Sequence, residues 1–193
     1  MLSHSRGMLG AMKTKDYLIV ALAPLAVLVI PLVGDLTDPS NWKWTWHDFV
    51  AGWVILALAT FAFRFLLTRK WSNLPYKLGA GLGVATSFLV TWINLAVQII
   101  GDENPAFVLY FLAVLIGVVG VGISRFEPAG MARAAFATAA AVFVIPIIAL
   151  ICWPVDFSPG VPQVFALNSG FVALFAASGL LFRRAARHGL VAA

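Results

Sequence analysis

The sequence predicts an all-α membrane protein, a compact bundle of six transmembrane helices that forms a single domain over residues 1–193. Hydrophobic residues make up 62% of the chain and its mean hydropathy is +0.95, which places it in the membrane class. Six apolar runs each approach the roughly 20 residues that cross a hydrocarbon core. The predicted spans are residues 17–34, 48–68, 77–100, 105–124, 130–153 and 163–182.

The connections between these runs alternate in charge. One side carries twelve of the 13 Lys and Arg residues and two acids, a total of 12 − 2 = +10. The other side carries Lys43 and six of the eight acids, a total of 1 − 6 = −5. The positive-inside rule therefore predicts that both termini are cytoplasmic. Because the cations are spread over separate helix ends, they favour contact with the lipid bilayer and its anionic headgroups, and we expect no nucleic-acid partner.

The first span contains Pro24 and Pro31, seven residues apart, so we expect a bent helix whose two prolines share a face. The loop that follows places tryptophan at alternate positions, Trp42, Trp44 and Trp46. In an extended segment, alternation puts three indoles on one side. They would form either an aromatic belt at the headgroup level or a lid over the outer end of the bundle.

The second span begins at a capping box, in which Thr45 is the N-cap and Asp48 is the third helical residue. The fourth span begins after Asn104, which we expect to be its N-cap. Small residues at four-residue spacing predict close helix packing in the later spans. They are Gly79/Gly83 and Gly81/Ala85, Ala113/Gly117, the alanines from Ala134 to Ala141, and Ser169/Ala173/Ala177.

Charged residues are missing from the middle of every predicted span, which argues against a proton pump or a voltage sensor. Arg64 and Arg133 lie near span ends, where a long side chain can reach the interface. Cys152 is the one cysteine, which excludes an internal disulfide and a CxxC pair. The chain contains no recognisable metal, phosphate-loop or nucleophile motif, so we expect no catalytic residues, no metal and no cofactor.

A polar ridge on the third span is the strongest indication of a site. Ser87, Thr91, Asn94 and Gln98 stand at positions i, i+4, i+7 and i+11, which fall within about 60° of one another on a helix. The other residues of these turns are mostly apolar. One narrow face of this helix is therefore polar.

Four further residues extend the predicted ligand-binding site. Tyr110 and Asn168 lie near the outer ends of their predicted spans, at a depth in the membrane similar to that of the ridge. Asp48 and Glu103 lie above them at an acidic mouth, where they would attract a cation. The amides would offer neutral oxygens and donors deeper in, and aromatic rings would offer walls to an organic cation.

Two interpretations of these residues remain open. Inward-facing Ser, Thr, Asn and Gln often hydrogen-bond neighbouring helices, so the ridge would only hold the bundle together. Alternatively, it lines an outward-facing pocket of a small channel, transporter or receptor for a cation or small polar solute. The other function that we consider is a non-catalytic accessory or scaffold subunit of a larger membrane complex. Its partner would be another membrane protein or a second copy of the chain. His47 and Asp48 are adjacent in sequence and do not face each other on a helix, so we expect no enzyme.

One stretch of the chain reads Trp92-x-Asn94-Leu-Ala-Val-x-Ile-Ile-Gly101-x-Glu103-x-Pro105-Ala106, with Trp46-x-Asp48-Phe49 upstream and Arg125-Phe126-x-Pro128-x-Gly130-Met131-Ala132 downstream. With these segments the chain resembles a group of small bacterial integral membrane proteins of unassigned function. The resemblance covers most of residues 42–150. It implies a multi-pass protein of the bacterial inner (plasma) membrane, and it implies no activity.

Overall fold

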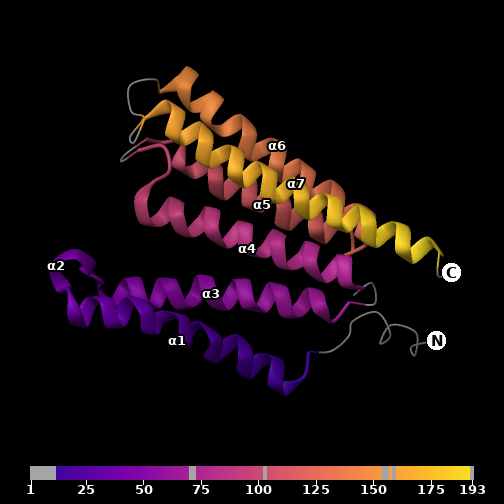
Figure 1. The fold of residues 1–193 in the computed structure, drawn as a ribbon, viewed down its shortest axis with the longest axis horizontal. Helices are drawn as coiled ribbons and strands as arrows, with labels where there is room; N and C mark the ends of the chain where they lie inside the picture. Colours follow the sequence, from indigo (N-terminus) through magenta and orange to yellow (C-terminus); the bar gives the residue numbers. More distant parts are fainter. Residues whose placement is uncertain (1–11, 70–72, 102–103, 154–156, 158–159, 192–193) are drawn as a thin grey trace. The chain divides into compact units, whose positions relative to one another are not determined.

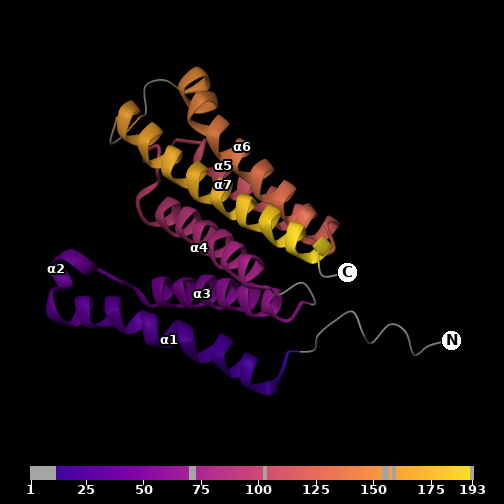
Figure 2. The same cartoon turned by 45° about the vertical axis from the view of Figure 1, so that its right-hand side comes forward.

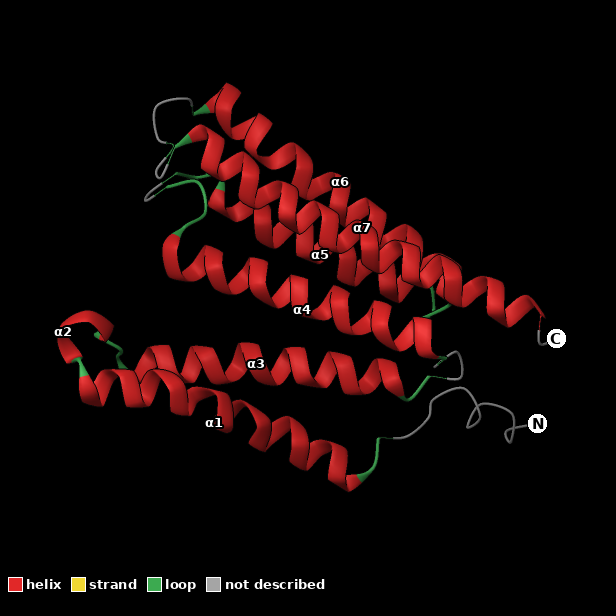
Figure 3. Ribbon diagram, in the orientation of Figure 1, coloured by secondary structure: helices red, strands yellow, loops and turns green. Residues whose placement is uncertain are grey.

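The computed structural model describes residues 12–69, 73–101, 104–153, 157 and 160–191 (Figure 1). This part of the chain contains seven α-helices and no strand (Figure 3). The helices are α1 (Thr14–Thr37), α2 (Pro39–Trp42), α3 (Trp46–Leu67), α4 (Leu74–Val97), α5 (Phe107–Ile123), α6 (Pro128–Cys152) and α7 (Val161–Val191). The all-α prediction is therefore confirmed for the described residues.

Five of these helices, α1, α3, α4, α6 and α7, are long and apolar enough to cross a membrane. The chain is thus a multi-pass membrane protein by the length and composition of its helices. The predicted span 105–124 corresponds to α5, which has 17 residues and is shorter than the other five. It begins late because residues 104–106 form a turn, in which the Ala106 N–H donates to Asn104 Oδ1 at 2.9 Å. Ala106, and not Asn104, is the N-cap of this helix.

The chain divides into two compact units, residues 1–70 and residues 71–193. The first unit is an antiparallel helical hairpin of α1 and α3. Trp53 on α3 donates its indole N–H to the Ala21 carbonyl of α1 at 3.2 Å, in the turn before Pro24. Pro24 and Pro31 both lie inside α1 and both are buried, as their shared face predicts. The predicted capping box of α3 is confirmed: the Asp48 carboxylate accepts the Thr45 N–H at 2.7 Å.

The tryptophan loop is not an extended segment, and that prediction was wrong. Trp42 ends the short helix α2, and Trp46 is the first residue of α3. The Trp42 indole lies so close to Gly34 that a Cβ there would be 2.3 Å from the ring. Trp44 instead contacts Phe49, with ring centroids 5.1 Å apart. Helix α2 forms because Pro39 suits the first helical position, so the three tryptophans do not follow one another along an extended backbone.

The second unit is a bundle of four helices, α4 to α7, in which α7 packs against α4 and α6, and α5 packs against α6 and α4 (Figures 1 and 2). Neighbouring helices run antiparallel. The start of α4 meets the end of α7, where Asn73 Nδ2 donates to the Ala185 carbonyl at 3.2 Å. The same end holds the α5–α6 turn, whose Phe126 carbonyl accepts the Tyr76 hydroxyl at 3.3 Å.

Small residues allow the helices of this bundle to approach closely. A Cβ on Gly117 of α5 would lie 2.7 Å from Thr138 Oγ1 of α6, and one on Gly120 would lie 2.8 Å from Ala134 Cβ. A Cβ on Gly83 of α4 would lie 3.0 Å from Ser178 Oγ of α7. These contacts agree with the predicted Gly79/Gly83 face of α4 and Ala113/Gly117 face of α5, whereas Ala85, of the second face predicted for α4, is exposed. The face predicted for α7 was wrong, because Ser169 and Ala173 are exposed while Phe171, Phe175 and Ser178 are buried.

Candidate functional site

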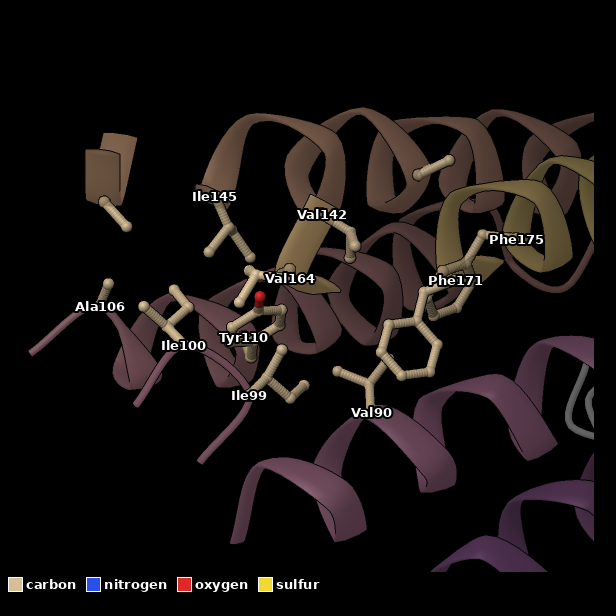
Figure 4. Close-up of a cluster of buried hydrophobic side chains, with 13 residues drawn as sticks. Val90, Ile99, Ile100, Ala106, Tyr110, Val142, Ile145, Val164, Phe171 and Phe175 are labelled. Atoms are coloured by element: carbon tan, nitrogen blue, oxygen red, sulfur yellow. The ribbon is translucent and has the colours of Figure 1, made fainter. Parts of the chain in front are cut away.

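The core of the second unit is largely apolar; its buried hydroxyls, on Thr86, Thr138 and Ser178, donate to backbone carbonyls, whereas its buried asparagines gather near one end. This end is where α4 and α6 finish and where α5 and α7 begin. The apolar cluster includes Val90, Ile100, Val142 and Val164, and Tyr110 stands among them with its hydroxyl directed toward Val164 (Figure 4). Three asparagines, Asn94, Asn104 and Asn168, are buried in this unit and are exposed by no more than 2% of their surface.

Asn168 joins α7 to α5. Its Nδ2 donates to the Tyr110 hydroxyl at 2.8 Å and to the Val164 carbonyl one turn earlier at 2.9 Å. Both hydrogens of the amide are thus used. The Asn168 Oδ1 is buried and has no hydrogen-bond partner among the described residues.

Asn94 joins α4 to the first turn of α5. Its Nδ2 donates to the Phe107 carbonyl at 2.8 Å. This carbonyl lies one turn before Tyr110, so Asn94 and Asn168 both bind α5 near its start. The Asn94 Oδ1 is likewise buried with no partner in the described part of the chain.

Asn104 organises the turn that leads into α5. Its Oδ1 accepts the Ala106 N–H, and its backbone carbonyl accepts the Phe107 N–H at 3.1 Å. The Asn104 Nδ2 is buried and finds no acceptor among the residues that the structure describes. Burial and the turn geometry together identify this side chain; from sequence we expected only a helix cap.

The three amides therefore share one property: each has one bonded half and one unbonded half. The unbonded atoms are two acceptor oxygens, on Asn94 and Asn168, and one donor NH2 group, on Asn104. A buried polar atom without a partner costs about 1–3 kcal/mol, so this end of the unit retains unsatisfied hydrogen-bonding capacity. Chemically, it can accept two hydrogen bonds and donate at least one.

The remaining ridge residues contribute less to this arrangement. Ser87 is half-buried and donates its hydroxyl to the Gly83 carbonyl of its own helix at 2.9 Å. Thr91 is also half-buried on α4. Gln98 does not continue the predicted helical ridge, because α4 ends at Val97 and Gln98 has a φ of 45°. The ridge therefore ends at Asn94, and Ile99 and Ile100 turn into the core instead of extending the helix.

The two carboxylates of the predicted acidic mouth lie outside the described part of the second unit. Asp48 belongs to the first unit, where it is exposed and caps α3 through Thr45. Glu103 lies outside the described residues, as does Asp102. A groove of about 610 Å³ lies between α1 and α3 in the first unit, and its lining is apolar: Leu25, Leu28, Val29, Leu32, Phe49, Val50 and Trp53. The polar candidate site thus consists of Asn94, Asn104, Tyr110 and Asn168.

One further polar interaction was not predicted from the sequence. Asp16, near the start of α1, forms an ion pair with Arg64, near the end of α3. The charge pattern predicts both residues on the cytoplasmic side, and this was the one indication in the sequence that they could form an ion pair.

The described residues contain no group of three or more His, Cys, Asp or Glu side chains that could hold a metal ion. Comparison with known proteins adds no assignment: no family model matches the chain, and neither a curated protein nor a solved structure does.

Proposed function

We propose that the second unit binds a small uncharged polar solute at Asn94, Asn104, Tyr110 and Asn168, as part of a small channel, transporter or receptor of the bacterial inner membrane. In this proposal, the end that carries the asparagines faces the periplasm, as the charge pattern of the loops predicts. The single observation that carries the proposal is the set of three buried amide atoms without a partner among the described residues.

Helix packing alone explains why one polar atom of each asparagine side chain is hydrogen-bonded, but not why the other is buried without a partner among the described residues. The bonds from Asn94 to Phe107 and from Asn168 to Tyr110 join helices and stabilise the bundle by about 0.6 kcal/mol each on average. The unbonded Oδ1 atoms of the same residues oppose this gain, since each costs about 1–3 kcal/mol while it is unsatisfied. A solute that donates to these oxygens removes the cost, which supports a binding role beside the packing role.

The described donors and acceptors of the site suit an uncharged polar solute. Within the described part of the second unit, Glu127 is the one carboxylate, and it lies at the opposite end, just before α6. A buried cation needs a carboxylate or several converging oxygens to replace its hydration. Two amide oxygens, one amide NH2 group and a phenol hydroxyl instead suit a small molecule that has both donors and acceptors.

An accessory-subunit role remains the second candidate, and one observation favours it. Ser169, Gly170 and Ala173 form an exposed small-residue face on α7, and a Cβ on Gly170 would meet nothing within 4 Å. Helices that associate in lipid commonly use such faces. Gentle solubilisation at native expression levels followed by mass measurement tests this role, and a lone monomer would eliminate it.

Thiol accessibility tests the solute site directly. In a Cys152→Ser background, Asn168→Cys and Val164→Cys place thiols one turn apart on α7, at positions that are 2% and 1% exposed. We expect 2-hydroxyethyl methanethiosulfonate, a small uncharged polar reagent, to modify the Asn168→Cys thiol at least tenfold faster than the Val164→Cys thiol. Val164 is the matched control because it is equally buried and lies nearer the start of the helix.

The other outcomes of this experiment overturn the proposal. Equal modification of both thiols would mean that the helix end opens non-specifically. Modification of neither would mean that the amides only hold the helices together. Proteoliposomes that swell equally with the unaltered protein and with Asn94→Leu, in glycerol and in urea gradients, would remove the channel form of the proposal.

A further inference from the structure

We propose that the end of the second unit opposite the asparagines binds the headgroup of an anionic phospholipid. The contact groups are the guanidinium groups of Arg133 on α6 and of Arg183 and Arg187 on α7, which we term the arginine clamp. This inference concerns a different end of the unit from the proposed solute site and does not depend on it.

An aromatic platform fixes the centre of the arginine clamp. The Arg183 guanidinium carbon lies 4.6 Å from the centroid of the Phe136 ring of α6, a cation–π arrangement. The ring is itself confined, because a Cβ on Gly179 of α7 would lie 2.9 Å from it. Arg183 therefore contacts α6 as well as its own helix.

The other two arginines lie one helical turn from this contact. Arg133 precedes Phe136 by three residues on α6, and Arg187 follows Arg183 by four residues on α7. Residues at these spacings are neighbours on a helix surface, about 5–6 Å apart between their Cβ atoms. Because α6 and α7 run antiparallel and pack against each other, these spacings place the three cations at the same end of the helix pair.

No described carboxylate neutralises the arginine clamp. Within the described residues, the one salt bridge joins Arg64 and Asp16 in the first unit. Arg133, Arg183 and Arg187 are all exposed. Guanidinium groups bind phosphate oxygens in a bidentate manner, and exposed cations of one sign at the end of a membrane helix attract anionic lipids.

The surface beside the arginine clamp fits a lipid better than a free phosphate ion. Leu180 precedes Arg183 by three residues on α7 and is 53% exposed, and Phe143 on α6 is 54% exposed. Both lie toward the middle of their helices relative to the arginines. A phospholipid can place its phosphate on the guanidinium groups and its acyl chains along this apolar surface, whereas inorganic phosphate gains only the first contact.

Lipid retention by the purified full chain tests the inference. We expect native mass spectrometry, after exchange into equimolar phosphatidylglycerol and phosphatidylcholine, to show preferential retention of phosphatidylglycerol. Arg183→Gln should weaken this retention about fivefold, the factor that corresponds to about 1 kcal/mol for one arginine near an anionic surface. Arg125→Gln is the matched control, because Arg125 is exposed at the same end of the unit but lies in the α5–α6 turn.

A second pair of variants separates a defined site from general charge attraction. Phe136→Leu leaves the net charge unchanged but removes the platform under Arg183, so retention should fall, whereas Phe136→Tyr should preserve it. Equal losses for Arg125→Gln and Arg183→Gln would overturn the inference, as would full retention by Phe136→Leu with an unchanged melting temperature. Displacement of the lipid by inorganic phosphate at equal concentration would instead identify a phosphate-ion site and would also overturn it.

Discussion

Arg64 on α3 forms an ion pair with Asp16 on α1, and the same Asp16 carboxylate accepts the Lys13 N–H at 2.8 Å. Asp16 is only 6% exposed, so its charge depends on these two partners. One carboxylate thus closes the first turn of α1 and connects it to the last turns of α3. The pair holds the ends of the hairpin that lie farthest from α2.

The ion pair should contribute measurably to the stability of the hairpin. Arg64→Gln leaves the Asp16 carboxylate without its cation, and we expect a lower melting temperature, with a smaller loss than for a fully buried pair because Arg64 reaches solvent. Thermal unfolding in detergent measures the loss. Lys15→Gln, at an exposed position beside Asp16, is the control and should change little. Additive effects of Asp16→Asn and Arg64→Gln in the double variant would contradict the pairing.

Loss of the hydrogen bond between Asn168 and Tyr110 should lower the free energy of unfolding only modestly, although both residues are buried. Tyr110→Phe removes the acceptor but leaves Asn168 Nδ2 bonded to the Val164 carbonyl, so we expect a loss of about 1 kcal/mol. In a Tyr110→Phe background, Asn168→Leu should cost less than it does in the unaltered chain, because the shared bond is already gone. A double-mutant cycle on unfolding free energies measures this coupling, and a coupling energy of zero would argue against the bond.

Close contact between α5 and α6 predicts opposite effects at two glycines of one helix. Gly117→Ala would place a Cβ 2.7 Å from Thr138 Oγ1, and we expect a loss of about 1–3 kcal/mol from the overpacked contact. Gly122→Ala meets nothing within 4 Å and should be neutral or slightly stabilising, since alanine favours a helix. Melting temperatures of the two variants provide the comparison. Equal destabilisation of both would show that α5 and α6 pack differently.

Asp38, at the start of α2, should titrate below the usual aspartate range. Hydrogen bonds from the Ser40 hydroxyl and the Asn41 amide lower the pKa of this exposed carboxyl. Because the folded-state pKa is lowered, the stabilisation is present above the unfolded-state pKa of about 3.9 and is lost as the pH falls through the folded value. Carboxyl NMR titration should give a midpoint below about 3.9, and Ser40→Ala should raise it. A midpoint that is unchanged by Ser40→Ala would remove the assigned cause.

Local patterns predicted much of this fold, and tertiary contacts account for the differences. Run length and hydropathy located the helix boundaries within about three residues, except that α7 continues nine residues beyond the predicted end at Phe182. Thr45 with Asp48 marked the start of α3 correctly. The end of α4 was missed because Gln98 adopts a positive φ. Glutamine, unlike glycine, does not indicate such a backbone conformation from sequence. The packing face of α7 was missed because its buried side is set by aromatic residues such as Phe171 and not by the small residues beside it.

The candidate site was predictable only as a set of residue types. Asn94, Tyr110 and Asn168 stood out as polar residues in apolar runs, and all three are buried in the second unit. Which half of each amide is bonded depends on where α5 begins, and that boundary follows from the turn at Asn104. The ligand roles of Ser87, Thr91, Gln98, Asp48 and Glu103 stay predictions.

The length of α7 has a consequence for how the protein fits its membrane. The helix has 31 residues and would be about 46 Å long, well beyond a hydrocarbon thickness of about 30 Å. The stretch from Val161 to Phe182, which ends just before Arg183, measures roughly 33 Å and matches that thickness closely. In a thinner bilayer, α7 must tilt to keep Arg183 at the interface. The tilt angle of α7 should therefore change with the thickness of the surrounding bilayer.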